Sequence, residues 1–322
     1  MSAELSVAPA RHRPDWLLPA LTLGPAVAGI IIAAIITPTF LNPDNILSIL
    51  RNASLIGIVA VAMTPLTLSG NFVSLGISQS AMAAMVAFVA LLGEGWNQLA
   101  TILVVLFGLV AIGMLQGVVV AAGMNPVITT LAAGAIIFGV VSEATEGRIV
   151  SVRDYPATWG GGDVIGIPIV ILVFVVFTAL LTLMMSRTVT GRETILVGAN
   201  RATAEISGIS LARVTIVAFA IFSIGLAIAG ILEGAAFGEA TAKSFPNLTI
   251  NAIAALLVGG TAIGGGQGSP LRSAAGALLI SVISNMMVLN DFSPGGRLAI
   301  QGAVVAAAVV LLDLFRRRGV RR

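Results

Sequence analysis

Long apolar stretches recur along this chain, separated by short polar or Gly- and Pro-containing breaks. A helix that crosses a bilayer needs about 20 mostly apolar residues. We predict ten such spans, the fifth and eighth being short enough to be broken or partly re-entrant: Leu17–Ile36, Ile46–Leu68, Ser74–Leu92, Leu99–Ala122, Val127–Val141, Ile167–Met185, Val214–Ala236, Asn251–Ile263, Ser273–Leu289 and Leu298–Leu314. The expected fold is an all-α polytopic membrane protein, with residues 1–322 forming a single domain.

The composition agrees with a membrane protein and excludes other classes. Hydrophobic residues make up 57% of the chain and charged residues 10%, whereas roughly 25% of an average soluble domain is charged. So few charges could not cover a soluble enzyme, a coiled coil or a disordered chain. The chain has no Cys and one His, His12, which leaves neither a disulfide nor an imidazole cluster for a metal. Its first apolar stretch is too long for a signal-peptide core and is expected to stay in the mature chain.

The positive charges predict the orientation. An even number of spans puts both termini on one side, and Lys and Arg favour the cytoplasmic side. With a cytoplasmic N-terminus, 12 of the 17 Lys and Arg residues fall inside. Those left outside are Arg51, Arg148, Arg153, Lys243 and Arg297. We therefore expect a cytoplasmic tail at 1–16 and a basic cytoplasmic tail at 315–322, the latter binding lipid headgroups and not nucleic acid.

The chain shows no machinery for chemistry of its own. Its only lysine, Lys243, lacks the Gly-rich lead-in of a phosphate-binding loop. Ionisable residues are almost absent from the middles of the spans, where an ion-coupled carrier commonly has them. Glu233, near the end of the seventh span, is interpreted as an interfacial carboxylate, with an ion-coupling residue as the alternative. We predict a non-enzymatic transport subunit, without catalytic or metal-binding residues, that takes its energy from another subunit.

The largest cytoplasmic loop, 186–213, contains a short predicted helix at Arg201–Ser207. Asn200 is a good N-cap and Gly208 can end the helix. A helix of this length is unstable alone. It is explained by docking into a groove on a cytoplasmic partner, with a simple tether between two spans as the alternative.

The surface of this predicted helix has two parts. Ala202 and Ile206, at i and i+4, form a small apolar face. Arg201 and Glu205 share the same spacing and predict a polar pair beside it.

Three segments of the chain resemble ribose-type ABC transporter permeases. The first joins Gly191-Arg192 to Val197–Asn200 and Ala204–Ile209, and is similar to the coupling loop of that family. The other two are Leu257–Ser269, followed by Gly276–Leu279 and Asn285, and Pro126–Leu131. Their order and spacing match over about residues 45–315.

The resemblance implies a permease subunit that imports a simple sugar or polyol by alternating access across a bacterial inner membrane. It also implies cytoplasmic ATPase subunits that bind the ATP, a second permease copy or paralogue, and an extracytoplasmic substrate-binding protein; no cofactor is expected in this chain. The implied ATPase-coupling residues are Gly191, Arg192, Asn200, Arg201, Glu205 and Gly208. Alternatives are a nucleoside, amide or amino-acid ABC permease, an ion-coupled secondary carrier and a non-transporting scaffold.

Two Gly-rich breaks, Ser69–Gly76 and Gly259–Gly268, lie beside spans in the two halves of the chain. Such interruptions predict an internal inverted repeat and a pathway lined by loosened backbone. The candidate pathway residues, each of which could instead form an interhelical hydrogen bond, are Asn71, Phe72, Ser74, Gln79, Asn251, Thr261 and Asn285. Phe72 stands where the family usually carries an acidic residue. Gly113-x-x-x-Gly117 predicts a helix-packing face.

Overall fold

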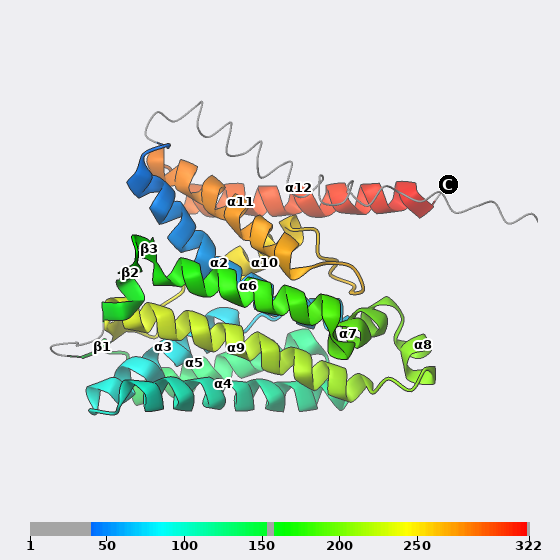
Figure 1. Cartoon of the computed structure of the whole chain (residues 1–322), viewed down its shortest axis with the longest axis horizontal. Coiled ribbons are helices and arrows are strands. Elements are labelled where there is room, and N and C mark those ends of the chain that lie inside the picture. Colours follow the sequence, from blue (N-terminus) through cyan, green and yellow to red (C-terminus); the bar gives the residue numbers. More distant parts are fainter. Residues whose placement is uncertain (1–39, 153–157, 321–322) are drawn as a thin grey trace, which may run out of the picture.

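The computed structural model describes residues 40–152 and 158–320, which are mostly helical. Most helices run along the long axis of the molecule (Figure 1). The helices of this bundle are α2 (Pro43–Leu68), α3 (Ile77–Gly93), α4 (Gln98–Ala121), α5 (Pro126–Ala144), α6 (Ile169–Arg187), α9 (Leu211–Phe237), α10 (Leu248–Val258), α11 (Pro270–Leu289) and α12 (Pro294–Val320), of which α2 and α11 are inclined to the long axis. The predicted all-α architecture is confirmed at this level.

Short elements gather at the two ends of this bundle (Figure 1). The helices α7 (Val189–Ala199) and α8 (Arg201–Ile206) lie at one end. At the other end, β1 (Val150–Ser151) pairs with β4 (Glu239–Ala240), and β2 (Asp163–Val164) pairs with β3 (Ile167–Pro168), both antiparallel. A 3₁₀ turn, η1 (Thr158–Gly161), lies beside α6 and α9.

Six of the described helices are long and apolar enough to cross a membrane: α2, α4, α5, α6, α9 and α11. The expectation of a short fifth span is wrong, since α5 begins at Pro126 and is 19 residues long. The eighth is short as predicted, because α10 has 11 residues. The third is shorter than predicted, since the Gly-rich break delays α3 until Ile77. Leu17–Ile36 and the 1–16 tail lie outside the described residues.

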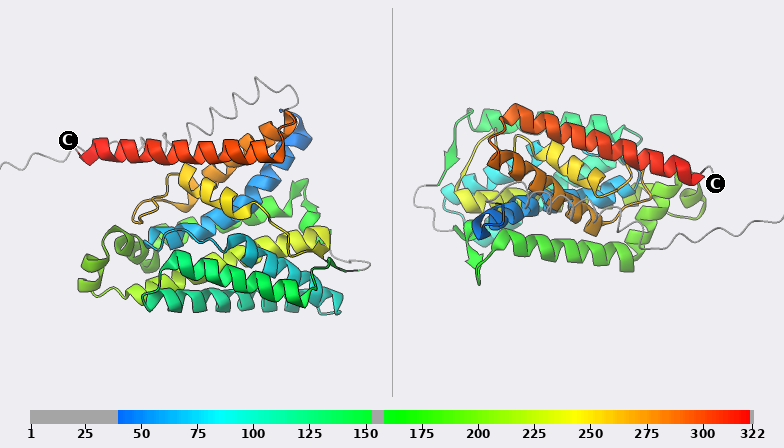
Figure 2. Two further views of the ribbon diagram at one scale, coloured as in Figure 1. Left: turned by 180° about the vertical axis from the view of Figure 1, so that it is seen from behind. Right: turned by 90° about the horizontal axis from the view of Figure 1, so that it is seen from above.

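The last helix runs past its predicted end. It begins at Pro294 and continues to Val320, so that most of the basic segment 315–322 belongs to the helix. It packs on α10 and α11, along one side of the bundle (Figure 2). Its C-terminal end lies at the same end of the molecule as α7 and α8 (Figure 1).

The centre of the bundle is α9, which packs against α2, α3 and α4. Two apolar clusters surround it, one shared with α2, α10 and α11 and the other with α3 and α4. By contrast, α4, α5 and α6 expose many large apolar side chains. An apolar outer surface of this kind suits contact with lipid.

The predicted packing face on α4 is confirmed, and its partner is α9. A Cβ on Gly113 would lie 2.7 Å from the Cβ of Ser223, and one on Gly117 would lie 2.9 Å from the Cα of Ile216. Both distances are shorter than van der Waals contact. The two glycines therefore let the backbones of α4 and α9 approach closely.

We expect Gly113→Ala to destabilise the protein by about 1–3 kcal/mol, since the added methyl group overpacks the α4–α9 contact. Thermal unfolding of the purified protein in detergent measures the effect. Gly108→Ala is the matched control on the same helix, because a Cβ there meets no atom within 4 Å. Equal melting temperatures for the two variants would contradict the assigned role of Gly113.

Candidate coupling site and translocation path

The 186–213 segment folds as two helices that are capped by side chains. The Thr188 hydroxyl accepts a hydrogen bond from Gly191 N at 3.2 Å, and Asn200 Oδ1 accepts one from Thr203 N at 3.1 Å. Gly208 has a φ of +81° and ends the second turn by donating to the Glu205 carbonyl at 2.9 Å. The predicted N-cap and terminating glycine are confirmed, whereas α8 ends at Ile206 and the helix α7 before it was not predicted.

The last residue of α8 is an apolar side chain exposed to solvent. Ile206 is 89% exposed, while Ala204 on the opposite face is buried against Val197 and Val214. One face of α8 thus holds it to the bundle and the other stands free. A short helix presented in this way is suited to docking into an apolar groove of a partner.

Arg201 does not pair with Glu205, and the prediction of that pair is wrong. The Arg201 guanidinium instead donates to Asn71 Oδ1 at 2.7 Å and to the Gly70 carbonyl at 3.3 Å. Asn71 is buried and offers a fixed acceptor, whereas Glu205 is exposed to water, where ion pairs contribute little. Arg201 therefore joins α8 to the Ser69–Gly76 break.

Asn71 extends this link to the central helix. Its Nδ2 donates to the Ser69 hydroxyl at 2.9 Å and to Thr215 Oγ1 of α9 at 3.3 Å. The hydrogen bonds from Arg201 through Asn71 to Thr215 connect the Ser69–Gly76 break to α8 and α9, which lie 130 and 144 positions away in the sequence. They form a direct path from α8 to the centre of the bundle.

We expect Arg201→Ala to leave the buried Asn71 Oδ1 unsatisfied, at a cost of about 1–3 kcal/mol. Adding Asn71→Leu should remove that unsatisfied acceptor and recover part of the lost stability. Chemical unfolding of the two single variants and the double variant measures this coupling. Strict additivity of the two changes would show that the Arg201–Asn71 hydrogen bond contributes nothing.

The two Gly-rich breaks meet at α7. Gly266 N donates to the Leu68 carbonyl at 2.9 Å, and a Cβ on Gly265 would lie 2.9 Å from the Cα of Gly70. A Cβ on Gly198, in the last turn of α7, would overlap the Leu68 carbonyl oxygen and lie 2.6 Å from Gly266 N. We call Leu68, Gly70, Gly198, Gly265 and Gly266 the glycine junction. Here α7 touches both breaks through backbone atoms.

The remaining candidate coupling residues lie elsewhere on α7 and α8. Gly191 is buried against the backbone of Met185 at the end of α6, where a Cβ would lie 2.5 Å from the Met185 Cα. Arg192 and Glu205 are exposed on α7 and α8. The structure therefore brings Gly191, Asn200 and Arg201 into the contacts that hold the segment, and leaves Arg192 and Glu205 on its surface.

Three further candidate pathway residues form hydrogen bonds within the fold, as Asn71 does. Ser74 Oγ accepts from Gly76 N at 3.3 Å, and Thr261 shares a 3.3 Å contact with the hydroxyl of Ser273. Asn285 exchanges hydrogen bonds of 2.8 and 3.1 Å with Asn45 of α2. Each of these residues thus forms the structural hydrogen bond that was the alternative to a pathway role. Their role in the pathway stays a prediction.

Phe72 behaves differently from its neighbours. It is 47% exposed and has a φ of +59°, in the left-handed region that bulky residues rarely adopt. Such strain persists only where the surrounding structure imposes it. Phe72 therefore presents its ring beside the glycine junction at a conformational cost.

Gln79 and Asn251 lie where two short helices meet. The first turns of α3 and α10 exchange hydrogen bonds, from Ser78 N to Thr249 Oγ1 and from Thr249 N to Ser78 Oγ, both 3.1 Å long. Gln79 Oε1 and Asn251 Oδ1, in the same first turns, are buried and have no partner among the described residues. Thr249 was not predicted from the sequence, although this hydroxyl residue lies only two positions before the candidate Asn251.

The comparisons with known proteins agree with this geometry. The family described as branched-chain amino acid transport system, permease component, matches residues 45–311. The ribose import permease protein RbsC of Bacillus subtilis is 31% identical over 88% of this chain and 88% of its own length. The probable ABC transporter permease protein YphD of Escherichia coli is also 31% identical, over 87% of this chain and 85% of its own. The L-arabinose transport system permease protein AraH of Escherichia coli is 28% identical over 62% of this chain and 60% of its own.

The family match spans most of the apolar helices, the α7–α8 segment and both Gly-rich breaks. The resemblance to ribose-type ABC transporter permeases is thereby confirmed. Six apolar helices agree with repeated membrane crossing. The chain belongs to the family of transport-system permease components and is a multi-pass protein of the inner membrane.

Proposed function

We propose that this chain is the membrane-spanning subunit of an ABC importer for a simple sugar such as a pentose. The observation that carries the proposal is the 31% identity to a ribose import permease over 88% of both chains. The arabinose permease supports the same substrate class. A branched-chain amino acid is the second candidate substrate, because it appears in the description of the matching family.

The chain performs no chemistry in this proposal. ATP is bound and hydrolysed by cytoplasmic partner subunits, and a second permease copy or paralogue completes the path. An extracytoplasmic binding protein delivers the substrate. The ATPase binds the exposed Ile206 at the end of α8. The resulting displacement of α7 and α8 is transmitted to both Gly-rich breaks through the glycine junction.

The proposed topology has ten spans, with both termini in the cytoplasm and an inverted repeat relating the two halves. The C-terminal end of α12 lies at the same end of the molecule as α7 and α8, which supports this topology (Figure 1). So do the two short helices α3 and α10, whose first turns pair through Ser78 and Thr249.

Reconstitution of the whole importer in proteoliposomes tests this function. With ATP inside and the binding protein outside, we expect labelled ribose to enter and labelled leucine to stay out. Uptake without ATP that stops when the ion gradient is collapsed would favour a secondary carrier. Uptake of leucine alone would favour the amino-acid alternative, and no flux of either would favour a scaffold.

A further inference from the structure

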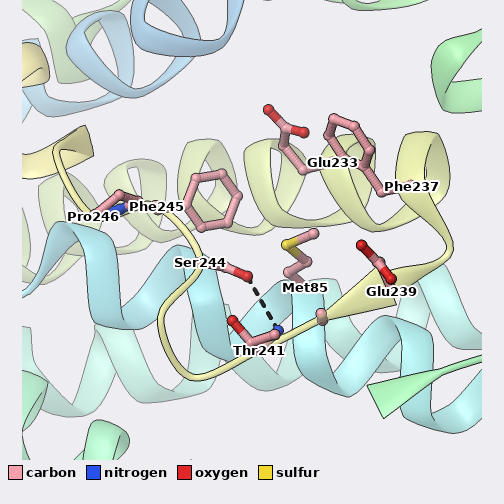
Figure 3. A pocket seen from close by; sticks show the side chains of 9 residues that line it. Met85, Glu233, Phe237, Glu239, Thr241, Ser244, Phe245 and Pro246 are labelled. Carbon is pink, nitrogen blue, oxygen red and sulfur yellow. Dashed lines mark hydrogen bonds between the residues drawn. The ribbon is translucent and has the colours of Figure 1, made fainter. Parts of the chain in front are cut away.

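A cavity of about 420 Å³ opens beside β4 (Figure 3), which pairs with β1 at the end of the molecule opposite α7 and α8 (Figure 1). Its walls come from α3, α9, β4 and the segment that joins β4 to α10. Its volume lies in the range of small-molecule sites. In the proposed topology this end faces outward, opposite to α7 and α8.

Two carboxylates line the cavity. Glu233 comes from the last turns of α9, where the sequence indicated only an interfacial carboxylate, and Glu239 from β4 (Figure 3). Neither forms a hydrogen bond or an ion pair with a described residue; the ion pair between Arg148 and Glu146 lies elsewhere. Lys243, in the adjoining segment, does not line the cavity. The acceptor oxygens of Glu233 and Glu239 are therefore available to a ligand.

Two phenylalanines complete the cavity. Phe237, one turn after Glu233 on α9, is 67% exposed. Phe245 has a φ of +62°, which is a strained backbone for an aromatic residue. Figure 3 shows both rings on the α9 side of the cavity, with Glu233. The segment that carries Phe245 is held by a 3.1 Å hydrogen bond from Thr241 N to Ser244 Oγ.

This combination suits a neutral polyhydroxylated molecule. Ionised carboxylates only accept hydrogen bonds, and the hydroxyl groups of a sugar donate them. An aromatic ring offers an apolar face for the C–H surface of a sugar ring. An amino acid would place its carboxylate beside Glu233 and Glu239, and no described Lys or Arg lines the cavity to pair with it.

We propose that the cavity lined by Glu233, Glu239, Phe237 and Phe245 is an outer subsite that accepts a neutral monosaccharide and disfavours amino acids. The proposal rests on the proposed function of sugar import. In this proposal the permease chain, in addition to the binding protein, distinguishes sugars from amino acids.

Site-specific labelling tests the subsite, because the chain contains no Cys. Thr241→Cys introduces one thiol on the cavity wall of the complete importer, assembled without the binding protein so that docking does not shield the cavity. Its reaction with a membrane-impermeant, uncharged maleimide is followed by mass spectrometry of this chain. We expect saturating ribose to slow labelling roughly tenfold, as mass action predicts for an occupied site, and leucine to have no effect.

Variants in the same background identify the groups that bind. Glu233→Gln with Glu239→Gln should abolish protection by ribose, and Phe237→Ala should weaken it. Glu143→Gln is the matched control for the carboxylates, since Glu143 is exposed and does not line the cavity. Phe292→Cys made in place of Thr241→Cys, on a residue that is 46% exposed outside the cavity, should label at one rate with and without ribose.

The outcomes separate this proposal from the proposed function. Ribose transport by Thr241→Cys without protection by ribose would overturn the subsite and leave the function standing. A thiol at Thr241→Cys that never labels would also overturn it, since the cavity would not open outward. Protection by leucine or by an amine equal to that by ribose would overturn the assigned chemistry. Failure of the importer to take up ribose in proteoliposomes would overturn the function.

Discussion

Gly198→Ala is expected to lower ATP-driven uptake by at least about tenfold. The added Cβ would overlap the Leu68 carbonyl oxygen and crowd Gly266 N, so that α7 must move away from both Gly-rich breaks. Closely packed backbone transmits displacement because it cannot be compressed. Uptake of labelled substrate into proteoliposomes, together with ATP hydrolysis by the same preparation, measures the loss.

Gly264→Ala is the matched control for this prediction. Gly264 lies in the same Gly-rich break as Gly265 and Gly266, yet a Cβ there meets no atom within 4 Å. We expect it to insert, assemble and transport like the unmodified chain. A Gly198→Ala importer that assembles and transports at the rate of Gly264→Ala would refute the role of the glycine junction in coupling.

Ile206→Asp is expected to weaken the association of the permease with its ATPase subunits by about 10- to 150-fold, the equivalent of about 1.5–3 kcal/mol for one buried aliphatic side chain. Because Ile206 is 89% exposed in the isolated chain, the change should leave folding intact. Its effect should appear only where a partner covers α8. Co-purification of the ATPase at rising detergent and salt concentrations, followed by a binding titration, measures it.

Val189→Asp separates this effect from a general loss of apolar surface. Val189 is 64% exposed at the first position of α7, where an acidic residue favours the helix dipole. It should retain the ATPase. Equal loss of the ATPase in both variants would mean that α8 is not the specific contact, and retention in both would mean that the segment is only a tether.

The local chemistry of α8 could be read from the sequence because capping depends on neighbours in the chain. Asn200 caps the helix and Gly208 ends it in the structure, as their side chains predict. The partner of Arg201 could not be read in this way. Glu205 was the nearer residue along the helix, but Asn71, 130 positions away, offers a buried acceptor. Contacts of that kind depend on tertiary folding.

The lengths of the spans were likewise predicted from the sequence only in part. The apolar run of α10 ends where the Gly-rich break begins, and its shortness was predicted. The length of α5 was not, because the polar Ser142 and Glu143 continue the helix past the apolar stretch. Apolarity marks which residues can enter lipid, whereas helix ends also follow from caps and packing.

The sequence by itself determined the membrane class, most of the apolar helices, the capped α8 segment and the family, because each depends on composition, periodicity or residue order. Only the tertiary structure decided that the two Gly-rich breaks meet at Gly198, that Arg201 reaches Asn71, and that Glu233 and Glu239 share a cavity. The first two contacts join residues distant in the chain, which no local propensity encodes, whereas Glu233 and Glu239 are near neighbours whose shared cavity is closed by α3. The meeting of the two breaks depends on the close backbone approach that glycine permits.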